Sequence, residues 1–227
     1  MEVLWNGVTM EDGPFPLGTD SVACAWFAGF PSRSKICDLG CGSGAISLML
    51  LATDSSLHLT GIELMPEAAA MAAKNAQHNG LDFTVIEGDL RSIRTIIPAG
   101  SMDGVISNPP YFPVGSGAVG ALSQARSEET CSLDQLTAAA GWLLKTGGRF
   151  VLVHRPERLA DLICSLRQQR LEPKRIRFVR HRSEGAVSLV LLEARKGGKP
   201  GLSYENDLVL FDHTGESEEY RKMYHRD

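Results

Sequence analysis

Short apolar runs of strand type alternate with helical patterns along most of the chain, and this alternation restricts the fold more than any other feature. It predicts strands over 35–40, 57–63, 82–89, 102–108 and 147–154, and helices over 44–53, 66–80, 132–145 and 156–169. Strand–helix alternation is typical of βαβ units, in which a mostly parallel sheet carries helices on both faces. The chain is therefore predicted to adopt an α/β fold.

Two further strands, over 173–181 and 186–196, are separated by only a short turn. Such a pair must be antiparallel, and we expect it at one edge of the sheet. The 227 residues, 43% of them hydrophobic, suit one globular domain with a small appendage. We expect the main domain over 1–196, with an N-terminal segment over 1–34, and a C-terminal extension over 197–227 whose charged end forms a short helix or frays.

Composition excludes several classes of protein. No apolar run reaches the ~20 residues that a membrane span needs, and the first residues are acidic where a signal peptide would be basic. The five cysteines form no C-x-x-C pair, and the six histidines lack metal-ligand spacing. The sequence therefore predicts a cytoplasmic protein with reduced thiols, no metal and no membrane partner, either a monomer or a homodimer.

A basic stripe, residues 167–182, stands out on a chain whose net charge is −4. It contains seven lysines and arginines, Arg175 and Arg177 among them, against the single acid Glu172. A local basic surface on an acidic protein can hold a polyanion at one place. A solvated helix and strand edge explains the same composition, and both interpretations remain open.

Acidic residues and glycines follow the first three predicted strands of the alternating region. The first strand ends in "DLGCGSGA", which places Gly40, Gly42 and Gly44 after Asp38, while Glu63 and Asp89 end the next two. Ligands of such sheets bind at the carboxyl ends of the strands, where an acid can accept the hydroxyls of an unphosphorylated ribose. Asp38 would repel a pyrophosphate but attract an ammonium or sulfonium group, which favours S-adenosylmethionine over NAD as the cofactor.

The fourth strand ends in "ISNPPYF". Pro109 and Pro110 fix their own φ angles, and Pro109 also keeps Asn108 extended. The side-chain oxygen of Asn108 and the carbonyl of Pro109 can each accept one hydrogen of a planar NH₂ group. Its nitrogen lone pair is then aimed at an onium methyl, so that catalysis is mainly positioning. Tyr111 offers a face on which a planar group can stack, and Phe112 can extend that wall. A rigid strand-to-loop turn is the structural alternative.

"DLGCGSG" together with "NPPYF" resembles the class I S-adenosylmethionine-dependent methyltransferases that modify planar amino or amide nitrogens. "PFPLGTDSVACAWFA" and "QARSEETCSLDQLTAAA" are similar to segments of the bacterial tRNA1(Val) adenine-N6-methyltransferase family. The resemblance covers roughly residues 15–196. It implies a Rossmann-like, seven-stranded sheet with an antiparallel edge hairpin, and methylation of N6 of an adenine in the anticodon loop of a tRNA.

The resemblance also assigns roles to residues. It implies a cofactor pocket lined by Gly18, Thr19, Asp20, Asp38, Gly40, Gly42, Gly44, Glu63, Asp89 and Asn108. It implies a catalytic turn formed by Asn108, Pro109, Pro110 and Tyr111, and places Arg126 and Glu128 in a segment on the substrate side. The candidate substrate contacts are Tyr111, Phe112, Arg126, Glu128, Arg175 and Arg177.

Two other functions are compatible with parts of the pattern. A protein glutamine methyltransferase of the release-factor type uses the same turn on a planar amide, but carries a helical substrate domain before the core, and only seventeen residues precede Gly18. A non-catalytic S-adenosylmethionine-binding module would have no reason to keep the two acceptors of the turn. The sequence therefore favours an RNA methyltransferase.

Overall fold

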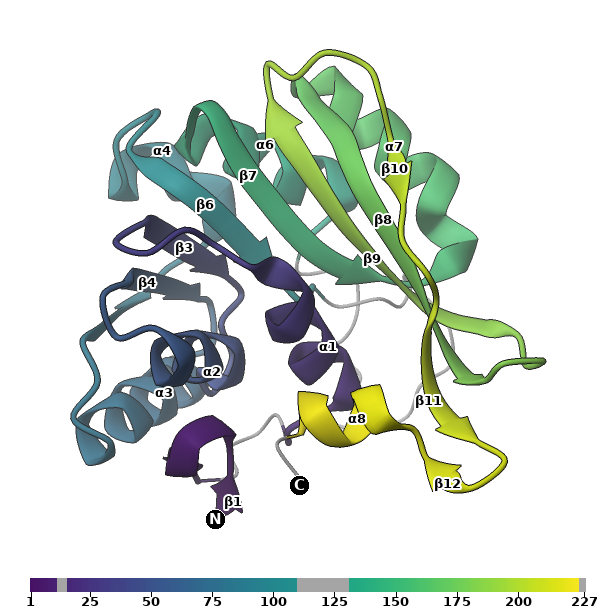
Figure 1. Ribbon diagram of the computed structural model, residues 1–227. Coiled ribbons are helices and arrows are strands. Elements are labelled where there is room, and N and C mark those ends of the chain that lie inside the picture. Colours follow the sequence, from purple (N-terminus) through teal and green to yellow (C-terminus); the bar gives the residue numbers. More distant parts are fainter. Residues whose placement is uncertain (12–15, 110–130, 225–227) are drawn as a thin grey trace, which may run out of the picture.

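A single large sheet organises the chain in the computed structural model, which describes residues 1–11, 16–109 and 131–224 (Figure 1). Its order is β12-β11-β8-β9-β7-β6-β3-β4-β5, and β10 also pairs with β8. The seven central strands are β3 (Lys35–Leu39), β4 (His58–Glu63), β5 (Phe83–Glu87), β6 (Met102–Ser107), β7 (Leu144–His154), β8 (Leu171–Arg182) and β9 (Val187–Lys196). Among these seven, β9 alone runs antiparallel to its neighbours.

Helices cover both faces of this sheet (Figure 1). One face carries α1 (Thr19–Ala28), α2 (Ala45–Thr53) and α3 (Pro66–His78). The other carries α4 (Ile93–Ile96), α6 (Leu133–Leu143) and α7 (Leu159–Gln168), with the short 3₁₀ turns η2 (Leu90–Ser92) and η3 (Pro156–Arg158) before α4 and α7. The predicted Rossmann-like α/β fold is thereby confirmed.

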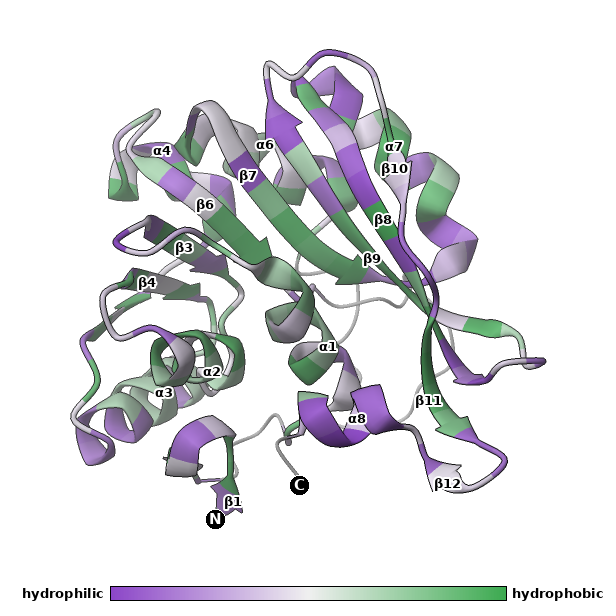
Figure 2. Cartoon of the chain, viewed as in Figure 1, coloured by the Kyte–Doolittle hydropathy of each residue, from purple (hydrophilic) through white to green (hydrophobic). Residues whose placement is uncertain are grey.

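Each central strand contributes to two separate cores, because its side chains alternate between the faces. Ile36 belongs to the core under α1 and α2, whereas its neighbour Cys37 belongs to the core under α6 and α7. Ile106 and Val105 of β6 divide in the same way. Strands buried on both faces read as nearly continuous apolar runs, which makes them easily found in the sequence, and β7 and the carboxyl end of β6 are green in Figure 2 for this reason.

The sheet has ten strands rather than seven, because the C-terminal extension adds three short ones. Strand β11 (Leu208–Asp212) pairs in parallel with β8, β12 (Gly215–Glu216) pairs with β11, and β10 (Ser203–Tyr204) also lies along β8. The expected hairpin β8–β9 is antiparallel, but the extension covers its outer strand. The prediction that this hairpin forms the edge is therefore wrong.

The N-terminal segment and the last described helix lie together beside α1 (Figure 1). The N-terminal residues form a small hairpin, β1 (Glu2–Val3) and β2 (Thr9–Met10), around the turn η1 (Trp5–Gly7). The indole of Trp5 donates to the carbonyl of Met223, at the end of α8 (Glu218–Met223), over 2.7 Å. The charged tail thus forms a short helix that packs against α1.

Candidate active site

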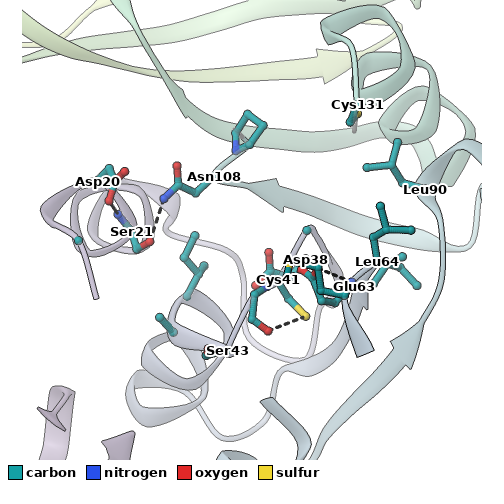
Figure 3. Close-up of a pocket in the computed structure, with 18 of the residues that line it drawn as sticks. Asp20, Ser21, Asp38, Cys41, Ser43, Glu63, Leu64, Leu90, Asn108 and Cys131 are labelled. Atoms are coloured by element: carbon teal, nitrogen blue, oxygen red, sulfur yellow. Dashed lines mark hydrogen bonds between the residues drawn. The ribbon is translucent and has the colours of Figure 1, made fainter. Parts of the chain in front are cut away.

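A cavity of about 310 Å³ opens at the carboxyl ends of β3, β4 and β6 and beside the first turn of α1 (Figure 3). Its position is the one expected for ligands of an open parallel sheet. Among the described residues, those that line it are Pro16, Gly18, Asp20, Ser21, Asp38, Gly40, Cys41, Gly42, Ser43, Ala45, Ile46, Ile62, Glu63, Leu64, Met65, Gly88, Asp89, Leu90, Asn108, Pro109, Cys131 and Arg155.

The glycine-rich loop after β3 forms the floor of the cavity. Gly40, Gly42 and Gly44 all have positive φ, between 55° and 91°, a region that residues with a side chain rarely adopt. At Gly44 a side chain would also meet Phe83 and Ala72 at about 3.2 and 3.3 Å. Gly44 does not line the cavity itself. It shapes the turn from which α2 begins.

Asp38 is the most deeply buried acid of the cavity, with 1% of its surface exposed. Burial raises the pKa of its carboxyl group to about 7, and the negative charge of Glu63 contributes, while a hydrogen bond from Ser47 opposes the shift. That bond, 2.8 Å long, satisfies Oδ2. Oδ1 has no hydrogen-bond partner among the described residues. A buried carboxylate oxygen without a partner is costly unless a ligand donates to it.

The two other acids predicted at strand ends already hold backbone or side-chain donors. Glu63 accepts the N–H of Gly42 at 2.8 Å and that of Met65 at 2.9 Å, one on each oxygen. Each oxygen keeps a second lone pair, so Glu63 can still accept the hydroxyls of a ribose. Asp89 accepts the backbone N–H of Arg91 and pairs with its guanidinium, which holds the pKa of Asp89 below its usual value.

Asn108 follows β6 and lines the cavity together with Pro109. Its side-chain amide donates to the hydroxyl of Ser21 over 2.9 Å (Figure 3). This bond turns the nitrogen of the amide toward α1 and its oxygen away from Ser21. The strand end itself is fixed by the hydroxyl of Ser107, which donates to the carbonyl of Leu39. The tip of β6 therefore presents an oriented amide to the cavity.

The residues of the cavity fit S-adenosylmethionine. Asp38 Oδ1 and Ser43 Oγ are buried polar atoms without a partner among the described residues, and both belong to cavity-lining residues. A carboxylate suits the ammonium of the methionine part, and a hydroxyl can bond its carboxylate. Glu63 can take the ribose and Leu64, with 42% of its surface exposed, can cover the adenine ring.

Some predicted site residues lie elsewhere. The hydroxyl of Thr19 lies 3.1 Å from that of Tyr224, and Thr19 does not line the cavity. Arg175 and Arg177 lie in the middle of β8, where Arg175 pairs with Glu193 and Glu205, and Arg177 with Glu219. Their binding of substrate remains a prediction. Pro110, Tyr111, Phe112, Arg126 and Glu128 lie outside the described residues.

The sequence interpretation missed many residues of the cavity, among them Ser21, Leu64, Cys131 and Arg155. Leu64 and Arg155 directly follow β4 and β7, so the rule that ligands bind at strand ends would have found both. Ser21 carries no such signal, because its role depends on the packing of α1 against β6. In the described part of the chain, no cluster of metal-ligating side chains exists, and no helix is long and apolar enough to cross a membrane.

This fold and this cavity define a class I S-adenosylmethionine-dependent methyltransferase. The family model of the methyltransferase small domain matches residues 24–163. A tRNA1(Val) (adenine(37)-N6)-methyltransferase of Porphyromonas gingivalis is 33% identical over 72% of this chain and 68% of the relative, and one of Dickeya chrysanthemi is 32% identical over 81% and 74%. The chain therefore belongs to the methyltransferase small domain family and, within it, to the bacterial tRNA1(Val) adenine-N6-methyltransferases.

Two other matches are to methyltransferases whose names give other substrates or reactions. A release factor glutamine methyltransferase of Deinococcus radiodurans is 31% identical over 67% of this chain and 59% of its own length. A predicted O-methyltransferase of Agrobacterium tumefaciens, known as a crystal structure, superposes with a TM-score of 0.75 over 91% of this chain and 96% of its own at 20% identity. At that identity the likeness is one of fold alone.

Proposed function

We propose that this protein transfers a methyl group from S-adenosylmethionine to N6 of an adenine in a tRNA. The observation that carries the proposal is the oriented amide of Asn108, next to Pro109, in a cavity whose carboxylates suit a cationic methyl donor. The relatives that are 32–33% identical carry this activity in their names, with adenine 37 of tRNA1(Val) as the target.

The chemistry assigned to the protein is positioning. Bound S-adenosylmethionine supplies an electrophilic methyl group on a sulfonium. The side-chain oxygen of Asn108 and the carbonyl of Pro109 each accept a hydrogen of the planar amine, which pyramidalises the nitrogen and aims its lone pair. The nitrogen becomes acidic as it gains the methyl group, so no strong base is required. Catalysis therefore rests on the positioning of the amine.

Methylation of a protein glutamine is the second candidate, favoured by the match to a release factor glutamine methyltransferase. A glutamine amide is also a planar NH₂ group, and the same two acceptors would hold it. The lower coverage of that relative, 59% of its length against 68% and 74% for the two tRNA enzymes, supports the adenine substrate instead.

The test is to incubate the protein with labelled S-adenosylmethionine and either total bacterial tRNA or purified release factor. The tRNA is then digested and the methylated nucleoside identified by mass spectrometry. We expect label in N6-methyladenosine and none in the release factor. Label in glutamine, or in a nucleoside other than N6-methyladenosine, would refute the proposal.

The variant Asn108→Ala links the activity to the cavity. It removes one of the two acceptors, so we expect kcat to fall by about 10²- to 10³-fold, the usual cost of losing one transition-state hydrogen bond. The dissociation constant of S-adenosylmethionine should change by less than about threefold, because the carboxylates of the cavity remain. Asn6→Ala is the matched control, since the amide of Asn6 bonds the carbonyl of Ala52, away from the cavity.

A further inference from the structure

The first turn of α1 carries the contact that orients the catalytic amide, yet its N-cap makes no side-chain hydrogen bond. The hydroxyl of Ser21, the third residue of α1, accepts the amide N–H of Asn108 (Figure 3). The N-cap, Gly18, has no side chain with which to accept an N–H group of that turn. A side chain at Gly18 would collide with Oδ1 of Asp20, which accepts the N–H of Ser21. Support for the start of α1 must therefore come from elsewhere in the fold.

Helix α8 provides such support, because it packs beside α1 and bonds it at two points (Figure 1). In the first turn of α8, Glu219 accepts the indole N–H of Trp26, in the last turn of α1, over 3.2 Å. At the C-cap of α8, the hydroxyl of Tyr224 lies 3.1 Å from that of Thr19, the first residue of α1. Tyr224 thereby reaches the turn of α1 that carries Ser21.

The ring of Tyr224 belongs to an aromatic row of the C-terminal extension. Its centroid lies 4.9 Å from that of Tyr220, which in turn lies 5.4 Å from the ring of Phe211 on β11. Tyr220 is buried, and Phe211 lies on a strand that pairs with β8. The row therefore connects the ring of Tyr224, and with it the hydroxyl that bonds Thr19, to the large sheet.

The positions of Thr19 and Tyr224 do not fit a direct role in cofactor binding. Thr19 does not line the cavity, although its neighbours Gly18 and Asp20 do, and Tyr224 does not line it either. The hydroxyl of Thr19 bonds that of Tyr224 instead. We therefore expect an effect of this pair on methyl transfer to pass through Ser21, the residue of the first turn that contacts Asn108.

Resting on the proposed function, we propose that Tyr224 is a positioning residue for methyl transfer. Its hydroxyl holds Thr19 and with it the first turn of α1, so that Ser21 keeps the amide of Asn108 aimed at the amine of the substrate. The C-terminal extension, which lies beyond the residues 24–163 that the family model matches, thereby becomes part of the catalytic unit. The pair acts on the rate of transfer and not on the binding of S-adenosylmethionine or of tRNA.

The test removes the bond between the two hydroxyls from either side. Tyr224→Phe and Thr19→Val each delete one hydroxyl with little change of shape, and Thr19→Ser keeps it. Tyr204→Phe is the matched control, because that hydroxyl bonds Asp207 within the C-terminal extension, on the exposed strand β10. For each protein, kcat and the KM for tRNA are measured at saturating S-adenosylmethionine. The dissociation constant of S-adenosylmethionine is measured by calorimetry, and folding is checked by thermal melting.

We expect Tyr224→Phe and Thr19→Val each to lower kcat by about fivefold, because each loosens the turn that orients the amide. The two changes together should cost no more than either alone, since they delete the same bond. Thr19→Ser should keep most of kcat, and Tyr204→Phe should match the wild type. The KM for tRNA and the dissociation constant of S-adenosylmethionine should change by less than about twofold throughout.

A double-mutant cycle with Ser21→Ala tests the route of the effect. If Tyr224 acts through Ser21, adding Tyr224→Phe to Ser21→Ala should lower kcat by less than about twofold further. A merely structural role of Tyr224 would instead lower the melting temperature and add its whole loss of kcat to that of Ser21→Ala.

Full losses of kcat from both changes in that double variant would overturn the inference, as would a wild-type kcat in Tyr224→Phe and Thr19→Val. In either case the proposed function stands. A raised KM for tRNA with unchanged kcat would also overturn it, by assigning Tyr224 to the binding of RNA. Weaker binding of S-adenosylmethionine by Thr19→Val alone would overturn it by assigning Thr19 to the cofactor. A wild-type protein that transfers no methyl group to any tRNA refutes the proposed function before the variants are compared, and the inference falls with it.

Discussion

A single buried carboxylate, Asp38, links cofactor binding to pH. Its pKa is raised to about 7, and a bound ammonium would favour its ionised form. We therefore expect the affinity for S-adenosylmethionine to rise about tenfold between pH 6 and 8 and then to level off, because the protein must lose a proton to bind. Calorimetry across this range measures the effect.

Two variants sharpen this prediction. Asp38→Asn should bind S-adenosylmethionine weakly and with no pH dependence between pH 6 and 8. Ser47→Ala removes the hydrogen bond that lowers the pKa of Asp38, so the midpoint of the affinity profile should move to higher pH. A wild-type affinity that is constant from pH 6 to 8 would contradict the role of Asp38.

The same shift makes a prediction about stability. The folded pKa lies above the ordinary value of 3.8, so between about pH 4 and 7 the folded state keeps a proton that the unfolded chain has lost. This contribution to the free energy of unfolding is present at acid pH and disappears as pH rises through 7. Asp38→Asn should lack it, so urea titrations at pH 5 and 8 should differ by less for the variant than for the wild type.

Ser21 positions the amide of Asn108 through the bond of 2.9 Å between them. We expect Ser21→Ala to lower kcat by about tenfold, since a misplaced catalytic group costs rate rather than affinity, and to leave the dissociation constant of S-adenosylmethionine unchanged. Ser21→Thr keeps the hydroxyl and should restore most of kcat. Ser101→Ala is the control, because that hydroxyl bonds the carbonyl of Pro98 near the opposite end of β6. Equal losses of kcat and of cofactor affinity would instead indicate a general disturbance of α1.

At the scale of elements, strong local signals in the sequence, such as a proline or a capping residue, were sufficient to predict where a helix begins. Helix α3 begins at Pro66, as predicted, and α6 begins at Leu133, one residue after the predicted start, with Ser132 as its N-cap. Helix α1 was not predicted, because it is apolar on nearly all sides and its N-cap, Gly18, has no side chain. It packs against the sheet, α2 and α8 at once, so no amphipathic period marks it. Strands β10 and β12 have two residues each and depend on β8 and β11 for pairing.

The cap of α6 allows a direct test of one such local signal. Ser132 Oγ accepts the N–H of Gln135, and the side chain of Gln135 accepts the N–H of Ser132. We expect Ser132→Ala to lower the free energy of unfolding by about 1 kcal/mol, whereas Ser132→Asp, which keeps an acceptor, should lose much less. Urea denaturation measures both, and equal stabilities of the wild type and the Ala variant would show that the capping box contributes nothing.

At the scale of the whole molecule, the basic stripe shows what a sequence pattern cannot reveal. Its arginines on β8 find their acids on other elements: Glu193 on β9, and Glu205, Asp207 and Glu219 in the C-terminal extension. These partners are distant in the chain. Composition alone therefore could not decide whether the stripe is a polyanion site or a solvated edge. Arg155, isolated in sequence, reaches the cavity because β7 lies beside β6.

The pair between Arg177 and Glu219 joins the extension to the main sheet, and its contribution should depend on pH. The guanidinium makes two bonds of 2.7 Å to Glu219, which also accepts from the indole of Trp26 on α1. These contacts, that with Arg177 foremost, lower the pKa of Glu219 below 4.5. Because the side chain of Glu219 is 38% exposed, we expect Glu219→Gln to lower the free energy of unfolding at pH 7 by only about 1 kcal/mol.

The direction of the pH dependence of this ion pair follows from the lowered pKa of Glu219. The ion pair stabilises the folded state above pH 4.5 and loses its effect as pH falls through the folded pKa of Glu219, so wild type and Glu219→Gln should converge in stability at acid pH. A double-mutant cycle with Arg177→Gln, measured by urea denaturation at pH 7 and again near pH 3, isolates the pair from the bond to Trp26. A coupling energy that is the same at both pH values would show that the extension is held by packing rather than by this ion pair.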